Sequence, residues 1–166
     1  MRDWLFRLVL LGTVAAVGFW AWRLFFPTPE HIIRKELSEL AVAASISPNE
    51  GALTKLAKTQ KLASFFCTNA QIAVDVPGRS IQTLTSREDI QQAAMSARMM
   101  LSSLKVQFVD IIVSIGADRQ SAVVHLTATA NLPGEKLPEV QELKIGFKSS
   151  NHDWLIDRLE TVKTLR

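Results

Sequence analysis

The hydrophobic pattern of the chain changes period at about residue 104, and this change limits the folds that the sequence can adopt. Beyond it, apolar residues recur at every second position in long runs, as they do in half-buried strands. Turn residues at 116–118, 133–134 and 149–152 separate these runs. Short turns join antiparallel neighbours, so this half of the chain predicts three or four long, consecutively paired strands.

The first of these strands contains an irregularity. Val106 and Phe108 lie on one face of a regular strand, whereas Val109, Ile111 and the apolar residues after them continue on the other. The period therefore slips near Asp110, as an inserted bulge residue would make it slip.

The part of the chain before residue 104 has helical spacing in three stretches, which open on helix-start signals at 28–30, 47–50 and 85–89. A short strand over 72–76, ended by Pro77-Gly78, separates the second stretch from the third. Helices followed by hairpin-linked strands predict an α+β domain with helices on one face of a curved antiparallel sheet. The apolar helix faces expected to pack on it comprise Ile33, Leu37, Leu40, Ala41 and Ala44, then Leu53, Leu56, Ala57, Leu62, Ala63 and Phe66, then Ile90, Ala93, Ala94, Ala97 and Leu101.

A separate apolar segment precedes this domain. Residues 4–26 would extend over about 34 Å as a helix, enough for a hydrocarbon core of about 30 Å. Bulky aromatics stand after the apolar run, where a cleaved signal peptide has small residues, so an uncleaved transmembrane anchor is favoured over a signal peptide or a core helix. We expect an anchor at 1–26, a short linker at 27–30 and the domain at 31–166.

The short charged start before the apolar run favours a cytoplasmic N-terminus, although the flanking positive charges are nearly balanced. We therefore expect a single-pass protein of a bacterial-type inner membrane, with the C-terminal domain periplasmic or extracytoplasmic. Residues 1–26 also carry two of the three net positive charges and seven of the twelve aromatic residues. The remaining domain has a net charge of +1 and few aromatics, which argues against nucleic-acid binding.

The order of elements resembles the nuclear transport factor 2-like superfamily, which includes SnoaL-like proteins. The resemblance rests on the strand that ends at Val76-Pro77-Gly78, the capped helix start at 86–90 and the closing run at 153–159, in which Trp154 precedes alternating apolar residues. It implies three helices packed on a cone-shaped curved sheet. In that superfamily the cone serves for catalysis, for small ligands or for protein contacts, so the fold alone does not choose a function.

Isomerases with this cone need a carboxylate base on the first strand and a tyrosine among the donors that hold an enolate. The chain has no tyrosine, and the matching base position is Val74, with Asp75 beside it on the opposite face of a regular strand. The histidines lack metal-ligand spacing, no phosphate-binding glycine loop is present, and Cys67 has no catalytic signature. We therefore predict no metal and no cofactor, and we favour a non-catalytic domain.

Two functions remain open from the sequence. The favoured one is assembly at the membrane with a protein partner or a second copy through the sheet, similar to the anchored assembly factors of type IV secretion systems. The alternative is a tethered small-molecule binder or SnoaL-like enzyme that uses the cone. Its candidate pocket residues are Asp75, Asp110, His125, Trp154 and Arg158, among which Asp110 and Arg158 are the preferred pair.

Overall fold

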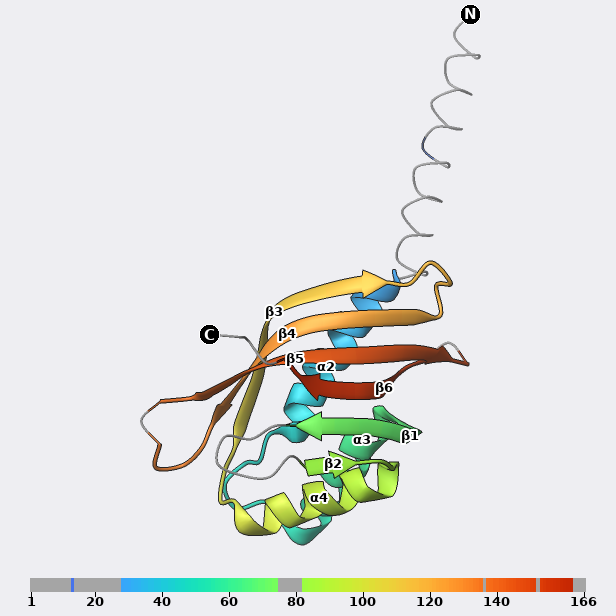
Figure 1. The fold of residues 1–166 in the computed structure, drawn as a ribbon. Coiled ribbons are helices and arrows are strands. Elements are labelled where there is room, and N and C mark those ends of the chain that lie inside the picture. The colour runs from blue at the N-terminus through green and yellow to red at the C-terminus, as the bar shows by residue number, and fades with distance from the viewer. Residues whose placement is uncertain (1–12, 14–27, 75–81, 136, 152, 163–166) are drawn as a thin grey trace, which may run out of the picture.

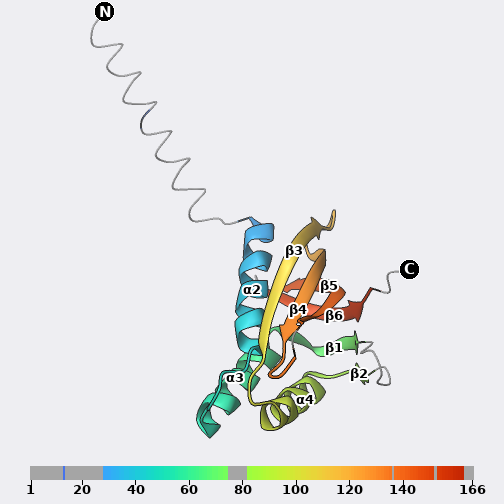
Figure 2. The same ribbon diagram turned by 90° about the vertical axis from the view of Figure 1, so that its left-hand side faces the viewer.

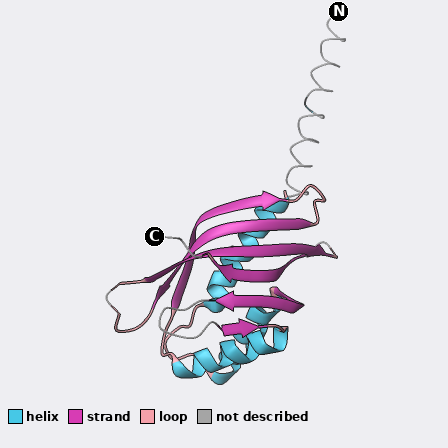
Figure 3. Cartoon of the chain, in the orientation of Figure 1, coloured by secondary structure: helices cyan, strands magenta, loops and turns pink. Residues whose placement is uncertain are grey.

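The computed structural model describes residues 13, 28–74, 82–135, 137–151 and 153–162. Three helices and six strands occupy this part of the chain, as Figures 1 and 3 show. In chain order they are α2 (Pro29–Ala44), α3 (Ala52–Ser64), β1 (Phe66–Val74), β2 (Gln82–Leu84), α4 (Arg87–Met100), β3 (Lys105–Ile115), β4 (Ser121–Asn131), β5 (Glu139–Ser150) and β6 (Asp153–Thr161).

The strands form one curved sheet in the order β2-β1-β6-β5-β4-β3. The hairpin-linked meander from β3 to β6 confirms the reading of the second half of the chain. The prediction of a purely antiparallel sheet was wrong, because β1 pairs in parallel with β6. Strand β1 also pairs in antiparallel fashion with β2, so it lies between the short edge strand and the last strand of the domain.

The helices lie on one side of the sheet and enclose the core against it, as Figure 2 shows. Ile33, Leu37 and Leu40 of α2 are buried, which confirms the helix face predicted from their spacing. They pack with Trp154, Ile156 and the inward-facing residues of β4 and β5, which are Ala122, Val124, Leu126, Leu143, Ile145 and Phe147. The space between α2 and strands β4, β5 and β6 is therefore filled by the domain's own side chains.

The second helix differs from its prediction. It begins at Ala52 rather than at Pro48, because Asn49 has a φ of 61°, which is outside the helical region. Of the predicted apolar face, Ala63 is buried, but Leu53 is 84% exposed and Phe66 belongs to β1. Helix α3 therefore packs through a narrow strip and leaves leucines in solvent.

The start of α4 follows its sequence signal. Ser86 Oγ accepts a hydrogen bond of 3.1 Å from the Asp89 N–H, as an N-cap residue does. Arg87 Nε donates to the Phe66 carbonyl oxygen at 2.9 Å, which fixes the first turn of α4 to the start of β1. The helix thus lies across the β1–β2 end of the sheet (Figure 2).

The irregularity predicted in the first long strand is present. The pairing of β3 with β4 shifts between Val109 and Ile112, and Asp110 has a φ of 52°. This bulge lets apolar residues on both sides of it serve the same core, since Phe108 before it and Val113 after it both pack inward.

A buried ion pair, which the sequence did not indicate, ties the helix ends together. Arg98 is 1% exposed and its Nη1 lies 2.8 Å from Glu50 Oε2, while its Nη2 donates to the Ala43 carbonyl oxygen. Glu50 Oε1 accepts hydrogen bonds from Lys58 Nζ at 2.5 Å and from the Ser47 N–H at 3.0 Å. The end of α2, the entry to α3 and the last turn of α4 therefore meet at one charged cluster.

The predicted anchor at residues 1–26 lies outside the described residues apart from Thr13. Among the helices that the structure does describe, none combines the length and the hydropathy that crossing a bilayer requires.

Candidate functional site

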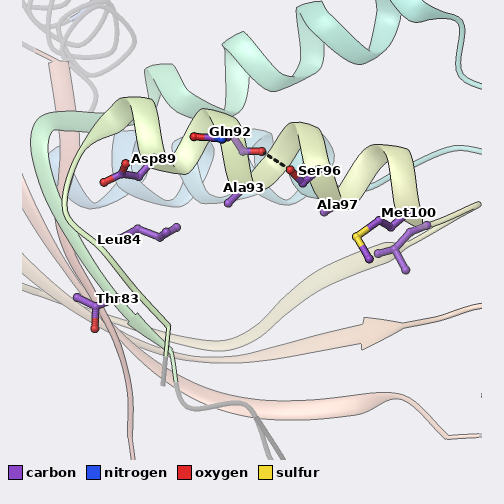
Figure 4. A pocket seen from close by; sticks show the side chains of 9 residues that line it. Thr83, Leu84, Asp89, Gln92, Ala93, Ser96, Ala97 and Met100 are labelled. Atoms are coloured by element: carbon purple, nitrogen blue, oxygen red, sulfur yellow. Dashed lines mark hydrogen bonds between the residues drawn. The ribbon is translucent and has the colours of Figure 1, made fainter. Parts of the chain in front are cut away.

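One cavity lies beside α4, between that helix and strand β2. It has a volume of about 730 Å³, within the range of ligand sites in proteins. Helix α4 forms one wall and β2 contributes Thr83 and Leu84, as the close-up in Figure 4 shows.

The wall of this cavity is a single helix face. The lining residues of α4 are spaced by three and four positions, which places them in one stripe along the helix: Asp89, Gln92, Ala93, Ser96, Ala97 and Met100. Only Ala93 and Ala97 of these were predicted to face the core. The alternating three-and-four spacing of small and polar residues next to the apolar stripe was the sequence signal that could have identified this wall.

Two polar side chains of the cavity, Ser96 and Asp89, make local hydrogen bonds. Ser96 Oγ donates to the Gln92 carbonyl oxygen at 2.9 Å, the bond drawn in Figure 4. Asp89 Oδ2 accepts from the Thr85 N–H at 3.3 Å. The hydrogen bond with Ser86, followed by that with the Thr85 N–H, lowers the pKa of the Asp89 carboxyl. Among the described lining residues Asp89 alone is ionisable, and a carboxylate with a lowered pKa is a weak base at neutral pH.

The structure does not gather the predicted pocket residues into this cavity. Asp75 lies outside the described residues, and Trp154 is 5% exposed and belongs to the core. Asp110, His125 and Arg158 are all exposed. His125 and Arg158 lie on strands β4 and β6, with β5 between them. His125 alternates with buried Val124 and Leu126, whereas Arg158 points outward because the pairing of β5 with β6 shifts register after Ile156. The nearest polar contact of Arg158 is with Gln71 Oε1, at 3.5 Å from Nη2.

The surface that carries His125 and Arg158 is the outer face of the sheet, which is turned away from the helices. In the strand register, Ile112, His125, Lys144 and Glu160 form one row across β3, β4, β5 and β6. Apolar side chains are exposed on the same face: on β3 Ile112 is 63% exposed and Val109 43%, and on β5 Val140 is 60% exposed. Thr127 and Thr129 of β4 face Val109 and Val140 in the register, and the exposed Glu142 of β5 is the other partner of Thr127.

Ion pairs cover the other half of the outer face. Lys148 Nζ lies 2.8 Å from Asp157 Oδ2, and Lys144 Nζ lies 3.2 Å from Glu160 Oε1. The hydrogen bond to Asp157 raises the pKa of Lys148. The outer face therefore carries exposed apolar side chains on β3 and at the start of β5, and a region of alternating charge farther along β5 and on β6.

Metal and thiol chemistry find little support in the described part of the chain. No group of three or more His, Cys, Asp or Glu residues in that part could hold a metal ion. The Cys67 thiol is half-buried, and burial, followed by the nearby Asp157 carboxylate, raises its pKa, which disfavours a reactive thiolate.

Comparison with known proteins gives a clear result for the fold alone. No protein-family model matches the sequence, and no curated protein matches it either. Among solved structures, a nuclear transport factor 2-like protein with a cystatin-like fold from Novosphingobium aromaticivorans is similar, with 15% identity over 85% of each chain and a TM-score of 0.62.

Two further structures agree with it. A putative scytalone dehydratase from the same organism is 11% identical over 82% of this chain and 84% of that one, with a TM-score of 0.59. A domain of unknown function from Nostoc punctiforme, also with a cystatin-like fold, is 15% identical over 85% and 80%, with a TM-score of 0.63. The described helices and the curved mixed sheet thus have the nuclear transport factor 2-like cone fold.

Proposed function

We propose that this chain is a non-catalytic nuclear transport factor 2-like domain that assembles at a membrane with a second copy of itself, through the outer face of its sheet. The proposal includes a single N-terminal anchor at residues 1–26, a bacterial-type inner membrane and a periplasmic or extracytoplasmic domain. The observation that carries it is the exposure of Ile112, Val140 and Val109 on one sheet face.

These three side chains lie on one face of the sheet, around Thr127 and Thr129 of β4. In the register, Val109 faces Thr127 and Val140 faces Thr129, while Ile112 faces His125. The central part of a protein interface is typically apolar and poor in charge, with charged groups at its rim. Here Lys144, Lys148, Asp157 and Glu160 surround the apolar part on one side.

The charges favour a second copy as the partner. In a two-fold contact each copy presents the same surface, so an acidic group must meet a basic one from the other copy. The outer face carries both signs next to the apolar region, with Lys144 paired to Glu160 and Lys148 paired to Asp157. Such a face can exchange ion pairs with its own copy.

The test is the mass of the purified full-length protein, measured by light scattering with the bound detergent subtracted. Wild-type protein should be dimeric, and Ile112→Lys should shift it to a monomer, because a charge would be buried at the centre of the contact. Met100→Lys is the matched control, since Met100 is 83% exposed but lies on α4. A monomeric wild type, or a dimer unaffected by Ile112→Lys, would refute the proposal.

A second candidate function is small-molecule binding in the cavity beside α4. It is supported by the 730 Å³ volume, by the apolar lining residues Leu84, Ala93 and Ala97, and by the fold likeness to a protein named a putative scytalone dehydratase. Catalysis is disfavoured because Asp89, the one ionisable lining residue, serves the helix start.

Native mass spectrometry tests this second candidate. A bound molecule would appear as a mass addition to the wild-type protein and would be lost in Ala97→Trp, which fills the cavity. The control is Gln60→Trp on the exposed side of α3. The absence of any addition after purification and after incubation with a metabolite extract would count against ligand binding.

A further inference from the structure

A second hollow, separate from the cavity beside α4, runs between α2 and the edge strand β3. It has a volume of about 630 Å³. Figure 2 shows the two elements that form it lying side by side, with β3 at the edge of the sheet next to α2. None of its lining residues belongs to the outer face at β5–β6 or to α4.

The sequence builds this groove from one helix face and one strand. On α2 the lining positions are 34, 37, 38, 41, 42 and 45, whose spacing by three and four places them on one face. On β3 the lining runs over 105–108, and the bulge at Asp110 returns Ile111 to the same side. Ser45 Oγ accepts a hydrogen bond of 3.0 Å from the Val106 N–H, so α2 and β3 are joined at one end of the groove.

The charge of the groove has one sign. Its lining includes Arg34, Lys58 and Lys105 and no acidic residue. Arg34 pairs with Glu30, and Lys58 pairs with Glu50, which also holds the buried Arg98. Together with these partners there are four cations, Arg34, Lys58, Lys105 and the buried Arg98, and two carboxylates, Glu30 and Glu50. Among the described residues no carboxylate lies within ion-pair distance of Lys105. The groove is thus left with two positive charges to be balanced.

The floor between the cations is apolar. Leu37 is fully buried at its base, Phe108 is half-buried and Val42 is 66% exposed at its rim. A smaller hollow of about 260 Å³ shares Ser38, Val42 and Lys58 with the groove, and its own charged residues, Glu39 and Lys61, pair with each other. An occupant that matches this surface is apolar along its length and anionic at one end.

We propose that the groove between α2 and β3 binds an amphipathic anion, a single alkyl chain that ends in a carboxylate or a phosphate. The head group would lie near Lys105 and Lys58, at the end of the groove where Ser45 joins α2 to β3 and net positive charge is available, and the chain would cover Leu37, Val42 and Phe108. The proposal does not depend on assembly through the outer face, because the two surfaces are built from different side chains.

Photocrosslinking of the full-length protein tests it. The probes are a long-chain fatty acid that carries a diazirine on its chain, the corresponding fatty alcohol, and a phosphatidylglycerol with the same labelled chain. Peptide mapping should place the fatty-acid label on residues 34–47 or 105–111, with several-fold less label from the alcohol. Labelling by phosphatidylglycerol in place of the free acid would identify a membrane lipid as the source of the anion.

Charge variants give the matched controls. Lys105→Gln should lose about two- to fivefold in labelling by the acid, since an exposed ion pair contributes a factor of that size. Lys105→Arg should retain the label, and Lys144→Gln on the outer face should leave it unchanged. Equal labelling by acid and alcohol, label spread evenly over the domain, or an acidic protein crosslinked at the groove in place of the lipid would overturn the proposal.

Discussion

Replacing Glu50 with glutamine should destabilise the domain more than any change of a surface charge. The Glu50 side chain is 3% exposed and the Arg98 side chain 2%, so the substitution leaves a buried guanidinium without its carboxylate. Removing one member of a buried ion pair costs about 3–5 kcal/mol, whereas exposed pairs contribute about 0–1 kcal/mol.

The pKa of Glu50 gives an independent magnitude. Burial by itself raises it, but the hydrogen bonds from Lys58 and the Ser47 N–H, with the charge of Arg98, lower it from 4.5 to about 2. That drop corresponds to about 3.4 kcal/mol at about 1.4 kcal/mol for each pKa unit. Lys58 is 29% exposed and water screens that side of the cluster, so we expect a loss of about 2–3 kcal/mol for Glu50→Gln.

The assay is urea unfolding of the full-length protein, followed by far-UV circular dichroism. With a slope of about 2 kcal/mol per molar urea, the midpoint should fall by about 1–1.5 M. Glu160→Gln, which breaks the exposed pair with Lys144, should move it by less than about 0.5 M. The double variant Glu50→Gln with Arg98→Met should lose less than the two single variants together, because no buried charge is left unpaired. Additive losses, or a Glu50→Gln midpoint equal to that of Glu160→Gln, would refute the assigned role of the pair.

The pH dependence follows from the same lowered pKa. A carboxyl whose pKa is lower in the folded state than in the unfolded state adds stability above its unfolded value, and this stability is lost as the pH falls through its folded value. The contribution of Glu50 should be complete above about pH 4.5 and disappear towards pH 2. The stability difference between wild type and Glu50→Gln should therefore narrow across that interval.

Four further outcomes are expected. Ser86→Ala should destabilise the domain by about 1 kcal/mol in urea unfolding, because the Asp89 N–H loses its cap acceptor; no change would mean that the cap is dispensable. Gly146→Ala should lower the melting temperature, since a Cβ there would lie 2.6 Å from Asp157 Oδ1 and disturb the Lys148 ion pair, and an unchanged melting temperature would show that Asp157 relaxes freely. Gly51→Ser should raise the melting temperature by about 1–3 °C, because the extended N-cap position has open space and gains a side-chain acceptor. A lower melting temperature would contradict this expectation. Alkaline phosphatase fused after Arg166 should be active in the periplasm of a bacterial host, and activity only of a cytoplasmic reporter would reverse the predicted orientation.

The sequence predicted the parts of the fold that rest on local chemistry. The long strands, their turns, the Ser86 cap and the slip at Asp110 are each encoded by residues within a few positions of one another. The parallel pairing of β1 with β6 was missed because it joins residues some ninety positions apart, and no turn residue encodes such a contact.

The candidate sites show the same division. His125 and Arg158 were taken as pocket candidates, yet strand alternation places His125 on the outer face, and a register shift after Ile156 turns Arg158 to the same face. The wall of the cavity beside α4 was missed because its stripe of small and polar residues lies next to the apolar stripe that was assigned to the core. The Arg98–Glu50 pair joins residues 48 positions apart, and neither has a local signal for burial.

Cysteine crosslinking in native membranes tests assembly through the outer face most directly. Ile112→Cys would be introduced with Cys67→Ser, so that the new thiol is the only one in the chain. A short bismaleimide should then produce a crosslinked product at twice the chain mass, while Met100→Cys in the same background, equally accessible on α4, should remain monomeric. Crosslinking at neither position, or equal crosslinking at both, would contradict a second copy on the outer face of the sheet.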